Sequence, residues 1–74
     1  MSARPVKRSL TLRGHRTSVS LEDEFWQAFR DIATAEGKAI NELATQIDAA
    51  RGTEAGLASA IRIHVLRHFR GNEG

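Results

Sequence analysis

The chain has no cysteine and no tyrosine, and only one proline, one tryptophan and one methionine among its 74 residues. Without cysteine there is neither a disulfide nor a thiolate-ligated metal site, and a reducing compartment fits this composition. A domain of this size buries only about 60% of the surface of its unfolded chain, so many such domains rely on a disulfide, a metal or a partner subunit. With disulfides excluded, we expect the chain to associate with itself.

Long apolar runs are also missing. Residues 1–20 contain no continuous apolar segment of the roughly 7–15 residues that a secretory signal requires. No segment approaches the ~18 apolar residues typical of a transmembrane helix. We therefore expect a soluble, cytoplasmic protein with no membrane partner.

Acidic residues are absent from the first 20 positions, which carry the bases Arg4, Lys7, Arg8, Arg13 and Arg16. The middle of the chain, from residue 21 to residue 54, has an excess of acids, so the net charge of +2 conceals a basic beginning. Lysine and arginine release counterions from DNA phosphates, and a basic arm on a small domain is therefore typical of nucleic-acid binding. A solvated arm without a partner would have the same composition.

Alternation with a period of two indicates β-structure before residue 22. Residues 9–13 contain a short alternation, with Leu10 and Leu12 as its apolar members, and Gly14 interrupts it. The segments on either side of Gly14 and His15 are either two strands of a hairpin or one extended run with a break. The second segment is a half-buried strand, with Thr17, Val19 and Leu21 on one face and Arg16, Ser18 and Ser20 on the other.

Helical periodicity follows the strand. The acids Glu22, Asp23 and Glu24 suit a helix N-terminus, Ser20 stands three residues before Asp23 as in a capping box, and Gly37 suits a helix end. We predict helices at residues 22–36, 40–50 and from 54 or 57 to 70. The residues expected to pack are Phe25, Trp26, Phe29, Ile32, Ala33, Ile40, Leu43, Ala44, Ile47, Leu57, Ala60, Ile61, Val65, Leu66 and Phe69.

The predicted fold is mainly α with one short β-strand. Because a single strand does not form a stable sheet, we expect it to pair with the same strand of a second copy, in an intermolecular two-stranded antiparallel ribbon of a homodimer. Thr17, Val19 and Leu21 would then point into the shared core. A two-stranded ribbon fits the major groove of B-DNA, where arginine pairs bidentately with guanine.

The segment RTSVSLEDEFWQAFRDIATAEGKAINELATQI resembles the ribbon-helix-helix DNA-binding domain, and RGHRTSVSLEDEFW is similar to short bacterial members of that family. The resemblance covers residues 16–50 and implies that the outward strand residues contact bases. It also implies that backbone N–H groups at the start of the second helix hold a phosphate. The implied base contacts are Arg16, Ser18 and Ser20, and the implied phosphate contacts are Ala39, Ile40 and Asn41 with Lys38 beside them.

Three features depart from the common family pattern. Glu22 stands where many members have proline, and Ala39 stands where many have a serine or threonine cap. Serine occupies two of the three positions implied to contact bases. We therefore expect recognition of the base sequence to depend mainly on Arg16. Bases outside the core ribbon would then supply much of the affinity through phosphates, namely Lys7, Arg8 and Arg13.

The expected organisation has three parts. Residues 1–15 form a basic N-terminal arm, with or without a short extra strand. Residues 16–50 form the ribbon-helix-helix core, and residues 51–74 add a C-terminal helix and tail.

Catalytic and metal-binding constellations are missing. His64 and His68 lie four residues apart on one helical face, but no third ligand accompanies them, and zinc sites normally have three or four ligands. There is no phosphate-binding glycine loop, nucleophile motif or carboxylate pair. We expect no enzyme activity, no metal and no cofactor.

The sequence therefore predicts a small transcriptional regulator that binds double-stranded DNA, with or without strict sequence specificity, as a homodimer or higher oligomer. Two alternatives remain open. Many antitoxins of toxin–antitoxin pairs have the fold that the resemblance implies. A dimerisation or adaptor module would instead bind a protein partner through the apolar positions of the C-terminal helix.

Overall fold

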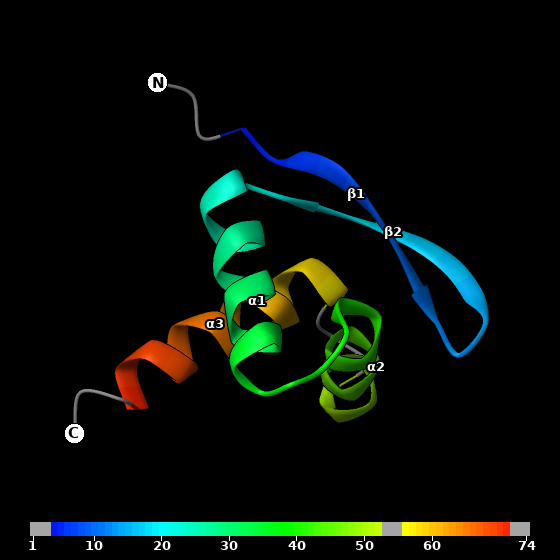
Figure 1. Ribbon diagram of the computed structural model, residues 1–74. Coiled ribbons are helices and arrows are strands. Elements are labelled where there is room, and N and C mark those ends of the chain that lie inside the picture. The colour runs from blue at the N-terminus through cyan, green and yellow to red at the C-terminus, as the bar shows by residue number, and fades with distance from the viewer. Residues whose placement is uncertain (1–3, 53–55, 72–74) are drawn as a thin grey trace.

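Two strands and three helices follow one another along the described part of the chain (Figure 1). The structure is a computed structural model that describes residues 4–52 and 56–71. The elements are β1 (Val6–Leu12), β2 (His15–Leu21), α1 (Asp23–Ala35), α2 (Ile40–Ala50) and α3 (Leu57–Gly71). Figure 1 shows the strands side by side as a long hairpin along one side of the helices. β1 packs beside α2, and β2 packs beside α3.

The hairpin is antiparallel, with Val6 opposite Leu21 and Leu12 opposite His15. A two-residue loop joins the strands, and both of its residues have positive φ, 53° at Arg13 and 81° at Gly14. Positive φ at both central positions is the signature of a type I′ turn, whose twist matches that of the two strands. Gly14 adopts this conformation without the penalty that a Cβ imposes.

The expectation of one strand per chain is wrong. β1 pairs with β2, so the two-stranded sheet that the structure shows is intramolecular, and pairing with a second copy stays a prediction. Of the two interpretations left open for residues 9–13, the hairpin is confirmed. The physical reason is local, because a two-residue turn brings the two alternating segments together with a much smaller loss of chain entropy than pairing between chains.

The helix α1 lies within one residue of its predicted bounds at both ends. Its N-cap is Glu22, which makes no side-chain capping hydrogen bond, so the predicted capping box of Ser20 and Asp23 does not form. At the other end, Gly37 has a φ of 69° and its N–H donates to Thr34, while the N–H of Lys38 donates to Ala33. This is a Schellman motif, and the prediction that Gly37 ends the helix is confirmed.

The other two helices also agree with the helical periodicity. α2 has the predicted bounds, and α3 begins at Leu57, one of the two predicted starts. The alternative start at residue 54 lies outside the described residues. Within the described ranges, none of the helices has the length and hydropathy that a bilayer crossing requires.

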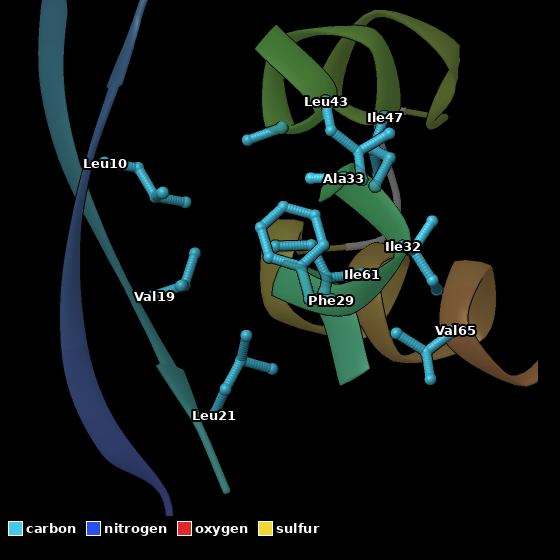
Figure 2. Packing of buried hydrophobic residues seen from close by; sticks show 11 residues of the cluster. Leu10, Val19, Leu21, Phe29, Ile32, Ala33, Leu43, Ile47, Ile61 and Val65 are labelled. Carbon is cyan, nitrogen blue, oxygen red and sulfur yellow. The ribbon is translucent and has the colours of Figure 1, made fainter. Parts of the chain in front are cut away.

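The hydrophobic core lies between the hairpin and the helices. Figure 2 shows Leu10, Val19 and Leu21 pointing from the two strands towards Phe29 of α1. Phe25 and Trp26, predicted to pack, are only partly buried against this core. The buried apolar residues are Leu10, Val19, Leu21, Phe29, Ile32, Ala33, Leu43, Ala44, Ile47, Ile61 and Val65.

The turn of the hairpin provides a direct test of this fold. A Cβ at Gly14 would meet no atom within 4 Å, so Gly14→Ala adds backbone strain and no clash. We expect the substitution to lower the free energy of unfolding by about 1–2 kcal/mol, because alanine disfavours positive φ. Urea denaturation followed by circular dichroism measures this loss.

Gly52→Ala is the matched control. A Cβ at Gly52 also meets nothing within 4 Å, and its φ lies outside the left-handed region. Its effect should stay within about 0.5 kcal/mol. An equal loss in the two variants would contradict the type I′ hairpin.

Candidate nucleic-acid interface

The outer face of the hairpin is polar and exposed. Residues directly opposite one another in an antiparallel pair share a face, and successive residues alternate between faces. The register therefore gives an outer face of three cross-strand pairs, which points away from the helices. The pairs are Lys7 with Ser20, Ser9 with Ser18, and Thr11 with Arg16, and every one of the six residues is exposed.

This outer face carries positive charge and no acid. Lys7 and Arg16 stand at opposite ends of it and on different strands, while serine and threonine occupy the other four positions. Arg13 and His15 lie exposed at the tip beside Arg16. The three predicted base-contacting residues thus share one surface with Lys7 and adjoin Arg13.

Arg8 lies on the inner face instead. Its register partner is the buried Val19, and its guanidinium forms an ion pair with Asp23 and lies 5.3 Å from the ring centroid of Trp26. Its side chain is 23% exposed. The sequence already indicated this inward position, because residues two apart along a strand share a face and Arg8 therefore lies on the face of Leu10 and Leu12. The structure therefore does not bring Arg8 together with the other residues predicted to contact DNA.

The N-terminus of α2 lies against β1. Its N-cap, Ala39, is extended and makes no side-chain capping bond, and the first N–H to donate within the helix belongs to Leu43, which bonds the Ala39 carbonyl 3.1 Å away. The preceding amides, which include those of Ile40 and Asn41, have no intrahelical acceptor, as is usual at a helix start. The side-chain oxygen of Asn41 accepts a hydrogen bond of 3.0 Å from the backbone N–H of Thr11. This contact joins the helix start to the end of the outer face that carries Arg16.

Lys38, the base predicted beside that helix start, is held by neighbouring side chains. Its ammonium donates to Gln46 at 2.7 Å and lies 3.1 Å from the Glu36 carboxylate. Its side chain is 28% exposed. The ammonium is therefore held beside the second turn of α2, and the carboxylate of Glu36 partly offsets its charge.

Arg62 of α3 contacts the other strand and was not expected from the sequence. It donates to the carbonyl of Ser20 at 3.2 Å and to the carboxylate of Glu22 at 3.0 Å. The pKa of Glu22 is lowered, first because of a hydrogen bond to its own backbone and then because of the bond from Arg62. Forty positions separate the two charged residues. Their attraction therefore leaves no local pattern in the sequence.

A second surface lies between α2 and α3. A groove there is lined by Ile47, Ala60 and Ile63, with His64 and Arg67 at its side. Farther along α3, Leu66 and Phe69 are about half exposed. In the described part of the chain, no three His, Asp or Glu residues are close enough to share a metal ion.

The comparisons with known proteins identify one family. A family model described as the ribbon-helix-helix domain matches residues 5–69, which include both strands and nearly all of α3. Neither the curated proteins nor the solved structures gave a match.

The lowered pKa of the Glu22 carboxyl, due first to a hydrogen bond to its own backbone and then to Arg62, predicts a pH dependence of stability. Because the pKa of Glu22 is lowered from its ordinary value of 4.5, its contribution is complete above that pH and is lost as the pH falls through the lower folded-state value. Glu22→Gln should therefore reduce the loss of stability on acidification below pH 4.5. Urea midpoints measured on both sides of that pH test this.

Glu24→Gln is the control for this measurement, because it removes the same charge from the same helical turn. Among the described residues, no base forms an ion pair with Glu24. On acidification the control should lose as much stability as the parent protein does, and a parent-like profile for Glu22→Gln would contradict the assigned role of the Glu22 carboxylate.

Proposed function

The chain belongs to the ribbon-helix-helix domain family, and on this premise we propose that it is a small transcriptional regulator whose hairpin enters the DNA major groove. Membership of the family implies DNA binding. The observation that carries the proposal for this chain is the outer face of the hairpin, which is exposed, basic and free of carboxylates.

The dimensions of the hairpin fit the groove. A two-stranded ribbon enters the major groove of B-DNA, which is about 12 Å wide, with its outer face towards the base edges. In this arrangement Arg16 pairs with a guanine, since its planar guanidinium matches the guanine O6 and N7 acceptors. Ser18 and Ser20 contact neighbouring bases with less discrimination, because a hydroxyl both donates and accepts.

Phosphate contacts flank this reading face. The free amides of Ala39, Ile40 and Asn41 and the α2 dipole favour an anion, and the Asn41–Thr11 bond holds that helix start beside the ribbon. Arg13 at the tip and Lys7 near the open end of the hairpin provide further positive charge. Lys38 would contribute to phosphate binding by leaving its ion pair with Glu36 and pairing with a DNA phosphate instead. Arg8 has a different role in this proposal, because its ion pair with Asp23 anchors the ribbon to α1.

Self-association is part of the proposal. Members of this family usually act as dimers, and two copies would present two hairpins to two half-sites of one duplex. We expect sedimentation of a dimer at micromolar concentration in analytical ultracentrifugation. A well-folded monomer at that concentration, with no association on DNA, would refute this part of the proposal.

A protein-binding module is the second candidate function. The observation that favours it is the partly exposed apolar series Ile63, Leu66 and Phe69 on α3. An antitoxin would use such a surface for a toxin and its hairpin for DNA, whereas an adaptor would show no DNA binding. The DNA measurements below therefore discriminate the adaptor from the regulator.

Binding of duplex DNA should depend steeply on salt, because each phosphate contact releases a counterion. The measurement is fluorescence anisotropy on sequences selected from random duplex DNA. If the protein binds no duplex DNA at about 50 mM salt, the proposal that it is a transcriptional regulator is wrong.

Arg16→Ala tests base reading. Loss of a bidentate contact to guanine should weaken binding to the selected site by about 1–3 kcal/mol, which is roughly 5- to 150-fold, and relax the preference at one position. Arg30→Ala is the matched control, because Arg30 is exposed on α1 and forms no ion pair within the described residues. An equal loss on every sequence would show that Arg16 contacts only phosphate.

A further inference from the structure

We propose that the outer face of α3 binds an acidic amphipathic helix of a partner protein. This inference goes beyond the proposed DNA binding and does not depend on it. It names the surface and the partner chemistry that a protein-binding role would require. Its basis is the arrangement of apolar and basic side chains on the exposed side of this helix.

Apolar side chains form one continuous row on the outer face of α3. Residues three apart along a helix share a ridge of its surface, and such a ridge packs into the groove of a neighbouring helix. Ala60 begins this apolar row at the groove between α2 and α3, a hollow of about 290 Å³. The row continues with three larger side chains, each about half exposed, which are Ile63, Leu66 and Phe69. It therefore offers a partner about two and a half turns of apolar surface.

A basic row runs directly beside the apolar row. It consists of His64, Arg67 and Arg70, which are also three residues apart. α3 contains no acid, and neither arginine forms an ion pair with another described residue. The helix dipole favours a cation in the last turn, where Arg70 lies, and its effect falls off towards Arg67. Exposed and uncompensated positive charge beside an apolar row is complementary to a surface that carries carboxylates.

The ring of Phe69 is suited to anchor a partner. The ring of His68 meets it edge-on, with 5.1 Å between the ring centroids. A side chain that is positioned before binding loses little conformational entropy when a partner arrives. Aromatic and arginine side chains contribute most to the affinity of protein interfaces, and this face carries both types at Arg67, Phe69 and Arg70.

A second copy of the chain is less complementary to this face than an acidic helix is. If the outer faces of two α3 helices packed together, Arg67 and Arg70 of one copy would approach the same arginines of the other. Like charges without acids between them oppose association. Charge complementarity therefore favours a different helix, with bulky apolar side chains on one face and glutamate or aspartate beside them.

A membrane surface is also less suited to α3. A helix that lies in the interface of a bilayer buries its main apolar face among the lipids. In α3 that face is already occupied, because Ile61 and Val65 lie in the hydrophobic core. The outer apolar row is only about half exposed, and a docked helix requires no more than such a row of anchors.

The proposed docking face is separate from the outer face of the hairpin. Figure 1 shows the end of α3 pointing away from the two strands. Arg62, the α3 residue that contacts Ser20 and Glu22, belongs to neither the apolar nor the basic row. A helix bound to these rows therefore leaves the polar outer face of the hairpin uncovered.

Synthetic peptides test the proposal with the full-length protein. The first probe is a fluorescein-labelled peptide of about 18 residues, long enough to form a helix, with leucine at every third or fourth position and glutamate beside the leucines. The second has lysine at each glutamate position, and the third keeps the glutamates but has serine for leucine. Fluorescence anisotropy should show binding of the first peptide alone, with affinity that falls as salt is added.

Variants on α3 locate the binding face. Phe69→Ala should weaken binding of the glutamate peptide by about 5- to 30-fold, as expected for the loss of an aromatic anchor, and Phe69→Leu should restore most of it. Arg67→Ala should weaken it by about two- to fivefold, and Arg67→Glu should bind the lysine peptide instead. Because these side chains are exposed, circular dichroism should show parent-like folding of every variant.

Arg16→Ala is the matched control for Arg67→Ala, because Arg16 is exposed on the outer face of the hairpin and forms no ion pair within the described residues. It should leave peptide binding unchanged and weaken DNA binding, whereas Arg67→Ala should do the reverse. If the parent protein binds the glutamate peptide but no duplex, the proposed DNA-binding function fails and this inference stands.

Four results would overturn the inference. The first is no binding of the glutamate peptide at about 100 μM, which leaves less than about 5–6 kcal/mol of affinity. The second is equal binding of the glutamate and lysine peptides, or parent-like binding by Phe69→Ala and Arg67→Ala together. The third is conversion of an oligomer to a monomer by Phe69→Ala in analytical ultracentrifugation, which would assign the face to a second copy. The fourth is binding to phosphatidylglycerol vesicles that Phe69→Ala abolishes, which would assign it to a membrane.

Discussion

The register between β1 and β2 is the constraint on which the rest of this structure depends. It places Leu10 of β1 and Val19 and Leu21 of β2 on one face, where they meet Phe29 of α1. The same register leaves a continuous polar and basic surface on the opposite face. A slip of one residue would move the apolar set to solvent and the basic set into the core. Burial of three apolar side chains therefore also determines which side chains remain exposed on the outer face.

Hydrogen bonds and ion pairs at the margins of the hairpin then determine its position on the helices. Asn41 holds β1, Arg62 holds the end of β2, and Arg8 connects the inner face to Asp23. Individually such exposed contacts stabilise a fold only slightly. Their arrangement matters more than their energy, because it sets the start of α2 beside the outer face and engages one backbone group on each strand. α3 is thus part of the ribbon's support, although it lies beyond the segment that first resembled the family.

The sequence predicted what depends on local pattern and missed what depends on distant charges. The helical periods gave all three helices, Gly37 marked the end of the first, and the alternation at residues 16–21 assigned the two faces of β2 correctly. The same alternation applied to Arg8 would have placed it inward with Leu10. The hairpin was left open because Arg13, an arginine in a left-handed conformation, is an uncommon turn residue. The contacts of Arg62 could not be foreseen, since they join segments about forty residues apart.

The acidic residues that directly follow β2 pose a final question, since carboxylates beside the proposed DNA-binding surface would repel phosphate. In the structure both carboxylates form ion pairs with arginines. Asp23 faces the inward Arg8, and Glu22 is bonded by Arg62, so both charges are compensated on the helix side of the hairpin. Both also lie at the N-terminus of α1, where the dipole favours negative charge. The abrupt change from basic strand to acidic helix therefore separates two functions within a few residues. The acids anchor the hairpin to the helices, and the outer face, from Lys7 to Arg16, keeps its positive charge.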